Sequence, residues 1–200
     1  MKFYWLGLMA IVMLACQKKE LPYMGRHEIN KSGDTVYHTV GDFKLLNQDS
    51  AWVGPDHYEN KIFVADFFFT SCPDICPIMA TQMLRVYNAY QDNDQIGFLS
   101  HTIDPEYDTP QVLREYANRL GVTNAQWQFV TGPQEDIYQI AQKYYMVTAT
   151  DDPDAPRGVI HSGAFILVDK NKRIRGIYDG TKPEKVDLLL SDLKTLLKEG

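Results

Sequence analysis

The chain has 200 residues, of which 44% are hydrophobic and 23% charged, as is usual for one globular domain with a substantial core. The formal net charge is −6, and no cluster of Lys and Arg forms a basic patch. These features argue against a nucleic-acid-binding protein, so no nucleic-acid partner is expected.

The N-terminus has the pattern of an export signal. Lys2 is followed by an apolar run over residues 3–15, which is too short to span a bilayer as a helix. The run ends in "MLAC", and the polar residues "QKKE" come next. This resembles the lipobox of bacterial lipoproteins, and the resemblance implies that Cys16 is lipidated and anchors an exported protein to a membrane facing the periplasm. A plain cleaved signal and an uncleaved anchor are the alternatives.

The segment after Cys16 predicts a tether. Residues 17 to about 35 are polar, contain Pro and Gly, and show no apolar period. The sequence therefore divides into a lipoprotein signal peptide (1–15), a lipid-anchored tether (16–35) and a folded domain (36–200).

Within the domain, predicted strands and helices alternate. The apolar and capping patterns predict strands at 61–69, 95–103, 127–130, 163–169 and 173–179, and helices at 77–90, 110–120, 133–145 and 183–198. The order β-α-β-α-β-α-β-β-α predicts an α/β protein with helices on both faces of the sheet and an antiparallel edge. This is the outline of a thioredoxin-like fold, a central mixed sheet flanked by helices.

The stretch "FFFTSCPDICPIM" (67–79) carries the clearest chemical signal. Cys72 is expected in the turn after a strand and Cys76 at the start of a helix. Unpaired N–H groups and the helix dipole favour anions there, so we expect both thiols to ionise more readily than a free cysteine. The spacing permits a disulfide if the loop bends, or a two-thiolate site for Cu(I), zinc or an iron–sulfur cluster.

The five histidines include one candidate for a third ligand. His161 directly precedes the strand that should neighbour the cysteine-bearing one, so its imidazole is that candidate; from spacing alone its role stays open. His101, inside a predicted strand, is read as a hydrogen-bonded core histidine. Asp104 and Asp108 are candidates for supporting the active loop.

Three blocks of the chain resemble the Sco/SenC family, copper proteins that help to assemble cytochrome c oxidase. They are "FTSCPDICPIM", "HTIDPEYDTPQVLREYA" (101–117) and "HSGAFILVDKNKRI" (161–174), and the similarity covers roughly residues 40 to 197. Two positions depart from the family pattern: Tyr107 stands where Arg is common, and Ile160 where Asp is frequent. The resemblance implies that Cys72, Cys76 and His161 bind one copper ion, as Cu(I) or Cu(II).

The resemblance further implies a membrane-tethered copper chaperone. Its expected partners are the copper-bearing subunit of cytochrome c oxidase, a copper donor protein, a thiol reductant and the membrane that holds its lipid. The alternative is a thiol–disulfide oxidoreductase in which Cys72 and Cys76 are the catalytic pair and no copper is held stably. A structural disulfide between the two cysteines is a third interpretation, although so short a loop would add little stability.

Overall fold

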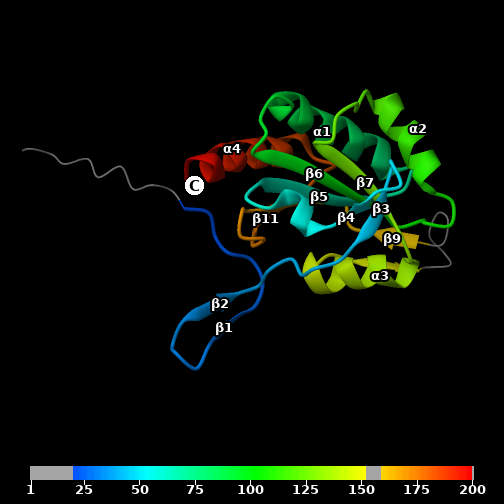
Figure 1. Cartoon of the computed structure of the whole chain (residues 1–200). Coiled ribbons are helices and arrows are strands. Elements are labelled where there is room, and N and C mark those ends of the chain that lie inside the picture. Colours follow the sequence, from blue (N-terminus) through cyan, green and yellow to red (C-terminus); the bar gives the residue numbers. More distant parts are fainter. Residues whose placement is uncertain (1–19, 152–158, 200) are drawn as a thin grey trace, which may run out of the picture.

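The protein is built around one seven-stranded mixed sheet (Figure 1). The structure, a computed structural model, describes residues 20–151 and 159–199, and the side chains of residues 149–161 lie outside the description. In the order β11-β10-β5-β6-β7-β3-β4, the strands are Ile174–Asp179, Ala164–Val168, Ile62–Phe68, Ile96–Thr102, Trp127–Thr131, Leu45–Asn47 and Trp52–Val53.

The centre of the sheet is parallel and its edges are antiparallel. β5 pairs with β6 and β6 with β7 in parallel, whereas β10 runs antiparallel to β5 and β11 antiparallel to β10. All seven residues of β5 are buried, as expected of a strand that is covered on both faces. The predicted α/β class and mixed thioredoxin-like sheet are confirmed, including the antiparallel edge formed by the last two strands.

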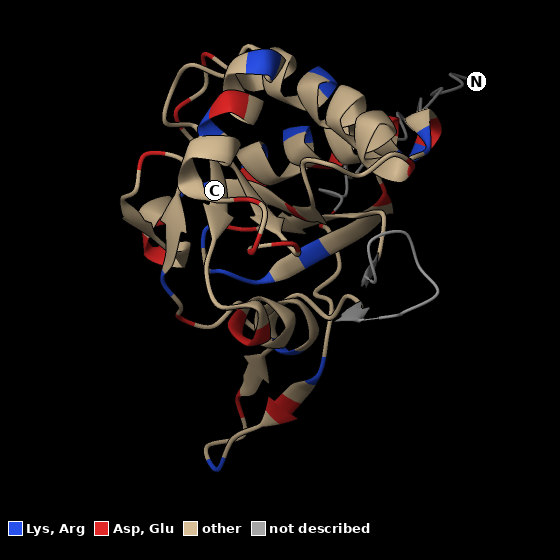
Figure 2. Cartoon of the chain, turned by 90° about the vertical axis from the view of Figure 1, so that its right-hand side faces the viewer, with Lys and Arg blue, Asp and Glu red and all other residues tan. Residues whose placement is uncertain are grey.

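Helices cover both faces of this sheet. Their bounds are α1 Ile75–Tyr90, α2 Pro110–Leu120, α3 Gln134–Gln139 and α4 Pro183–Glu199, with a 3-10 turn at Pro55–Tyr58 (η1) and a π-helical turn at Ile140–Tyr144 (η2). Figures 1 and 2 show α1, α2 and α4 on one face and α3 on the other. The ends of α2 are those predicted: the Thr109 hydroxyl accepts from the N–H of Val112, and Gly121 closes the helix at φ +76°.

One predicted helix differs from the observed element. The segment 133–145 was expected to be a single helix, but α3 ends at Gln139 and widens into η2. The N–H of Tyr145 donates to the carbonyl of Ile140, five residues back, and the Tyr145 side chain is fully buried. The wider turn thus directs a large aromatic ring into the core.

Two small two-stranded sheets accompany the main one. β1 (His27–Ile29) pairs with β2 (Thr35–Tyr37), and β8 (Ala149–Asp151) pairs with β9 (Val159–His161), both antiparallel. The β1–β2 hairpin projects below α3 in both views (Figures 1 and 2). Most of it falls in residues 16–35, the segment that the sequence predicted to be a tether, and β2 extends two residues beyond.

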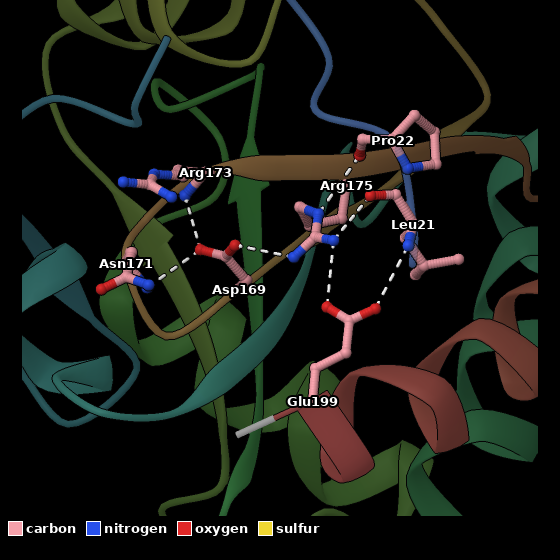
Figure 3. Close-up of polar contacts among 7 residues, drawn as sticks. All are labelled: Leu21, Pro22, Asp169, Asn171, Arg173, Arg175 and Glu199. Atoms are coloured by element: carbon pink, nitrogen blue, oxygen red, sulfur yellow. Dashed lines mark hydrogen bonds and ion pairs between the residues drawn. The ribbon is translucent and has the colours of Figure 1, made fainter. Parts of the chain in front are cut away.

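The start of the described chain is held to the domain by a buried arginine. The Arg175 guanidinium, 4% exposed, donates to the carbonyls of Leu21 and Pro22 at 2.6 and 3.2 Å (Figure 3). It also forms ion pairs with Asp169 and Glu199 at 3.1 and 3.0 Å. Leu21 is itself buried, so within the described residues packing onto the domain includes this position, well before the expected boundary near residue 36.

Candidate metal centre

Cys72 lies in the turn that leaves the carboxyl end of β5. Its N–H donates to the carbonyl of Phe69 at 3.2 Å, which bends the chain just past the strand. The side chain is half-buried and lines a cavity of about 320 Å³. Because active groups in an α/β sheet gather at the carboxyl ends of its strands, this is the position predicted from the sequence.

Cys76 occupies the first turn of α1, as predicted, but it is buried. Its exposed fraction is 3%, and both cysteines are free thiols. Burial raises the pKa of the Cys76 thiol, and a hydrogen bond with Cys72 raises it further. The expectation that both thiols ionise readily is therefore wrong for Cys76, because loss of hydration outweighs the effect of the helix terminus.

The loop between β5 and α1 (residues 69–74, the cysteine loop) is held by hydrogen bonds to Asp108. This buried carboxylate accepts from the backbone N–H of Thr70 at 3.0 Å, from the Thr70 hydroxyl, and from the Thr102 hydroxyl at 2.5 Å. Burial raises the pKa of Asp108, although the three hydrogen bonds act in the opposite direction. The candidate role of Asp108 in the loop is thus realised through contacts with Thr70, two residues before Cys72.

A second buried carboxyl group, that of Asp66, was missed by the sequence analysis. It lies in β5 and is 5% exposed; burial raises its pKa to about 7, and a hydrogen bond with Ser100 only partly opposes the shift. Its charge contributes to the raised pKa of Cys76. The signal was available, since Asp66 is the one charged residue inside the apolar run "IFVADFFF".

The structure describes the backbone of His161 but not its side chain. His161 ends β9, opposite Ala149. Two residues later, a Cβ built on Gly163 would lie 3.6 Å from Cδ1 of Ile75, the first residue of α1, which stands between the two cysteines in the sequence. The chain therefore returns next to the cysteines directly after His161, while the role of its imidazole as a ligand stays a prediction.

The remaining sequence-predicted residues fall outside this cluster. His101 is fully buried between aromatic rings, as expected of a core histidine, and Cys16 lies outside the described residues. Among the described side chains, no group of three or more His, Cys, Asp or Glu is arranged to hold a metal. A larger cavity of about 580 Å³, between Phe43, Asp56 and Lys172, contains neither cysteine.

Comparisons with known proteins decide the family. The profile described as SCO1/SenC matches residues 31–198. The chain belongs to the SCO1/SenC family. Its fold is similar to that of a SCO1/SenC family lipoprotein from Bacillus anthracis, with a TM-score of 0.73 and 28% identity over 80% of this chain and 95% of that one.

Two further solved SCO1/SenC proteins have the same fold. BsSco, a member of the Sco family of cytochrome c oxidase assembly proteins in which a disulfide switch was identified, gives a TM-score of 0.69 and 29% identity, covering 80% of this chain and 93% of its own. Yeast Sco1 with copper bound gives a TM-score of 0.62 and 26% identity, covering 78% of this chain and 89% of its own.

The helices among the described residues are too short or too polar to span a bilayer. Within residues 20–151 and 159–199, none is both long and apolar enough to cross a membrane.

Proposed function

We propose that this chain is a membrane-tethered copper chaperone that binds one copper ion through Cys72, Cys76 and His161 and assists assembly of the copper site of cytochrome c oxidase. The observation that carries the proposal is the pair of free thiols, within hydrogen-bonding reach of each other at the carboxyl end of β5. Membership of the SCO1/SenC family and the likeness to copper-bound yeast Sco1 support it.

The ligand chemistry fits copper in either oxidation state. Two thiolates are soft ligands that suit Cu(I), and an imidazole nitrogen helps to hold Cu(II). Cys72 is half-buried and reachable, whereas Cys76 is buried behind it, so copper arriving from solvent meets Cys72 first. Binding then displaces the proton of Cys76, whose raised pKa keeps the metal-free thiol neutral at physiological pH.

The anchor belongs to the same proposal. Lipid on Cys16 would hold the protein at a membrane surface facing the periplasm, with only residues 17–20 between the lipid and the packed residue Leu21. Confinement to the membrane raises the effective concentration of the chaperone near an integral-membrane oxidase. A copper donor protein and a thiol reductant complete the expected partners.

Copper stoichiometry tests this function. The chain with Cys16→Ser, reduced and in detergent, is loaded separately with Cu(I) and Cu(II), alone and with Cys72→Ser, Cys76→Ser or His161→Ala. We expect one copper per chain and a thiolate-to-Cu(II) absorption band, which each of the three further substitutions abolishes or shifts. A reduced protein that retains no copper after gel filtration contradicts the proposal.

A thiol–disulfide oxidoreductase is the second candidate, favoured by the contact between the half-buried thiol of Cys72 and the buried thiol of Cys76. The accessible Cys72 would attack a disulfide of an exported protein, and Cys76 would resolve the mixed disulfide, so that a Cys72–Cys76 disulfide forms and the client's two cysteines leave as thiols. His161→Ala separates the two functions. It should leave dithiol–disulfide exchange unchanged and remove copper binding, whereas exchange without any copper binding in the unsubstituted protein selects the oxidoreductase.

A further inference from the structure

A groove runs from the cysteines along the surface between α1 and α2. Its cavity of about 320 Å³ begins at Cys72 and Cys76 and extends along α1 as far as Leu84. The eight residue-to-residue steps from Cys76 to Leu84 rise about 12 Å along the helix, enough for three or four residues of an extended peptide. Figure 1 shows α1 and α2 next to each other on the same face of the sheet.

The walls of the groove are apolar and partly exposed. Leu84 comes from α1, and Tyr116 and Leu120 come from α2; all three are half-buried, so they present carbon surface to whatever enters. Cys72 presents a half-buried thiol to this lining, and the buried thiol of Cys76 lies next to it. An occupant that buries an apolar side chain here places its neighbouring residues at Cys72.

One cation lines the groove. Arg119 is exposed, and its guanidinium carbon lies 5.5 Å from the centroid of the Tyr116 ring, a contact that holds the charge at the groove. Within the described part of the chain, the guanidinium of Arg119 makes no hydrogen bond or ion pair. On a protein with a formal net charge of −6, this cation is a local complement for a carboxylate.

We propose that the groove between α1 and α2 binds an extended, cysteine-bearing segment of the client protein, with an apolar side chain between Leu84 and Leu120 and a carboxylate on Arg119. The inference rests on the proposed function, because a client that takes up copper or electrons must present its cysteine to Cys72. The length of the groove places the acidic residue within about four residues of that cysteine.

Short peptides test the docking directly. The full chain in detergent carries Cys16→Ser and Cys76→Ser, so that Cys72 is its only thiol. The probes are six-residue peptides in which glycine, leucine and aspartate follow the cysteine, together with peptides in which the same residues come in the reverse order. Matched peptides carry lysine in place of the aspartate, or serine in place of the leucine. Each peptide cysteine is supplied as its mixed disulfide with 5-thio-2-nitrobenzoate.

The reaction is a balanced thiol–disulfide exchange. The Cys72 thiolate attacks the peptide sulfur, a new disulfide joins protein and peptide, and thionitrobenzoate leaves with the electron pair of the broken bond and is measured by its absorbance. In at least one chain direction, we expect the aspartate peptide to react roughly fivefold faster than the lysine peptide, the effect of one half-exposed charge pair, and faster than the serine peptide.

Substitutions at the groove decide the outcome. Arg119→Glu should reverse the preference between the aspartate and lysine peptides, and Arg119→Gln should remove it. Lys194→Glu is the matched control, because it makes the same charge change at an exposed position of α4, outside the groove. Equal rates for the two charged peptides in both directions, or a preference that Arg119→Glu leaves intact, overturn the proposal.

Two further readings keep the result specific. If Arg119→Glu slows the reaction of the mixed disulfide of N-acetylcysteine as much as that of the aspartate peptide, Arg119 acts on Cys72 itself and docking is contradicted. Copper stoichiometry is measured on Arg119→Glu with Cys76 present. Copper binding without any preference among the peptides refutes the groove alone. A failure to bind copper in the protein that retains both Arg119 and Cys76 refutes the proposed function.

Discussion

Nδ1 of His101 lies 3.2 Å from the backbone oxygen of Asp66, and the pKa values of these two residues are shifted in opposite directions. A carbonyl oxygen can only accept, so Nδ1 carries a proton. Burial lowers the pKa of His101 to about 3 and raises that of the Asp66 carboxyl to about 7. The two groups lie in the adjacent strands β6 and β5. Protonation of His101 at low pH and ionisation of Asp66 at high pH each lower the free energy of unfolding.

The first prediction concerns His101→Phe. The unfolded chain binds a proton at His101 below a pKa of about 6.5, whereas the folded chain binds one only near pH 3. The free energy of unfolding therefore falls as the pH drops from 6.5 to 3, by on the order of 4 kcal/mol from this residue. His101→Phe keeps a ring against Phe67 and should remove this acid-dependent loss. Urea unfolding across this pH range measures it, with exposed His57→Phe as the control; identical slopes for the wild type and His101→Phe contradict the prediction.

Asp66→Asn should have the opposite effect. The folded chain holds the Asp66 proton up to about pH 7, whereas the unfolded chain loses it near pH 4. Stability contributed by this residue is full below pH 4 and is lost as the pH rises through 7, by on the order of 4 kcal/mol. The amide that replaces the carboxyl group is neutral throughout, so the variant should gain stability over the wild type above pH 7. A variant that is less stable than the wild type at pH 8 would refute this assignment.

Local sequence signals predicted those elements whose causes are local. The apolar run at β5, and the Thr109 cap and Gly121 of α2, identify their elements without help from distant residues. The burial of Cys76 could not be predicted in this way, because it depends on how α1 packs onto the sheet. Leu21 was misassigned to a tether because its partner Arg175 is 154 residues away along the chain. The position of Cys72, in contrast, followed from the buried strand before it.

Asp108→Ala should loosen the cysteine loop. The substitution leaves the buried hydroxyl of Thr102, and the partly buried N–H and hydroxyl of Thr70, without their acceptor. Each unsatisfied buried group costs about 1–3 kcal/mol, so we expect a loss of several kcal/mol in the free energy of unfolding and faster hydrogen exchange at the Thr70 amide. Asp104→Ala is the control, because Asp104 lies in the same β6–α2 loop as Asp108 but its side chain makes none of these contacts. Unchanged exchange at Thr70 would show that Asp108 does not position the loop.

Arg175→Met should release the first described residues from the domain. The substitution removes the donors to Leu21 and Pro22 and leaves Asp169 and Glu199 without their shared cation. Breaking a buried ion pair from one side costs about 3–5 kcal/mol. We expect faster proteolysis near residues 20–26, measured by mass spectrometry of the fragments, with Lys172→Met, an ion pair at the surface, as the control. Equal cleavage rates in Arg175→Met and the wild type would contradict this anchoring role.

Copper loading should be coupled to proton release from Cys76. Because burial raises the pKa of this thiol, the metal-free protein holds the proton at pH 7 to 8, and a Cu(I)–thiolate bond must displace it. The apparent affinity for Cu(I) should therefore rise at least about tenfold for each unit of pH in this range. Competition with a Cu(I) chelator whose own pH dependence is known measures the slope, and an indicator dye in weak buffer measures the protons. Cys76→Ser lacks this thiol and should release about one proton fewer per copper bound. A wild-type affinity that does not change with pH would mean that copper binds without deprotonating Cys76, and the buried thiol would then not be a ligand.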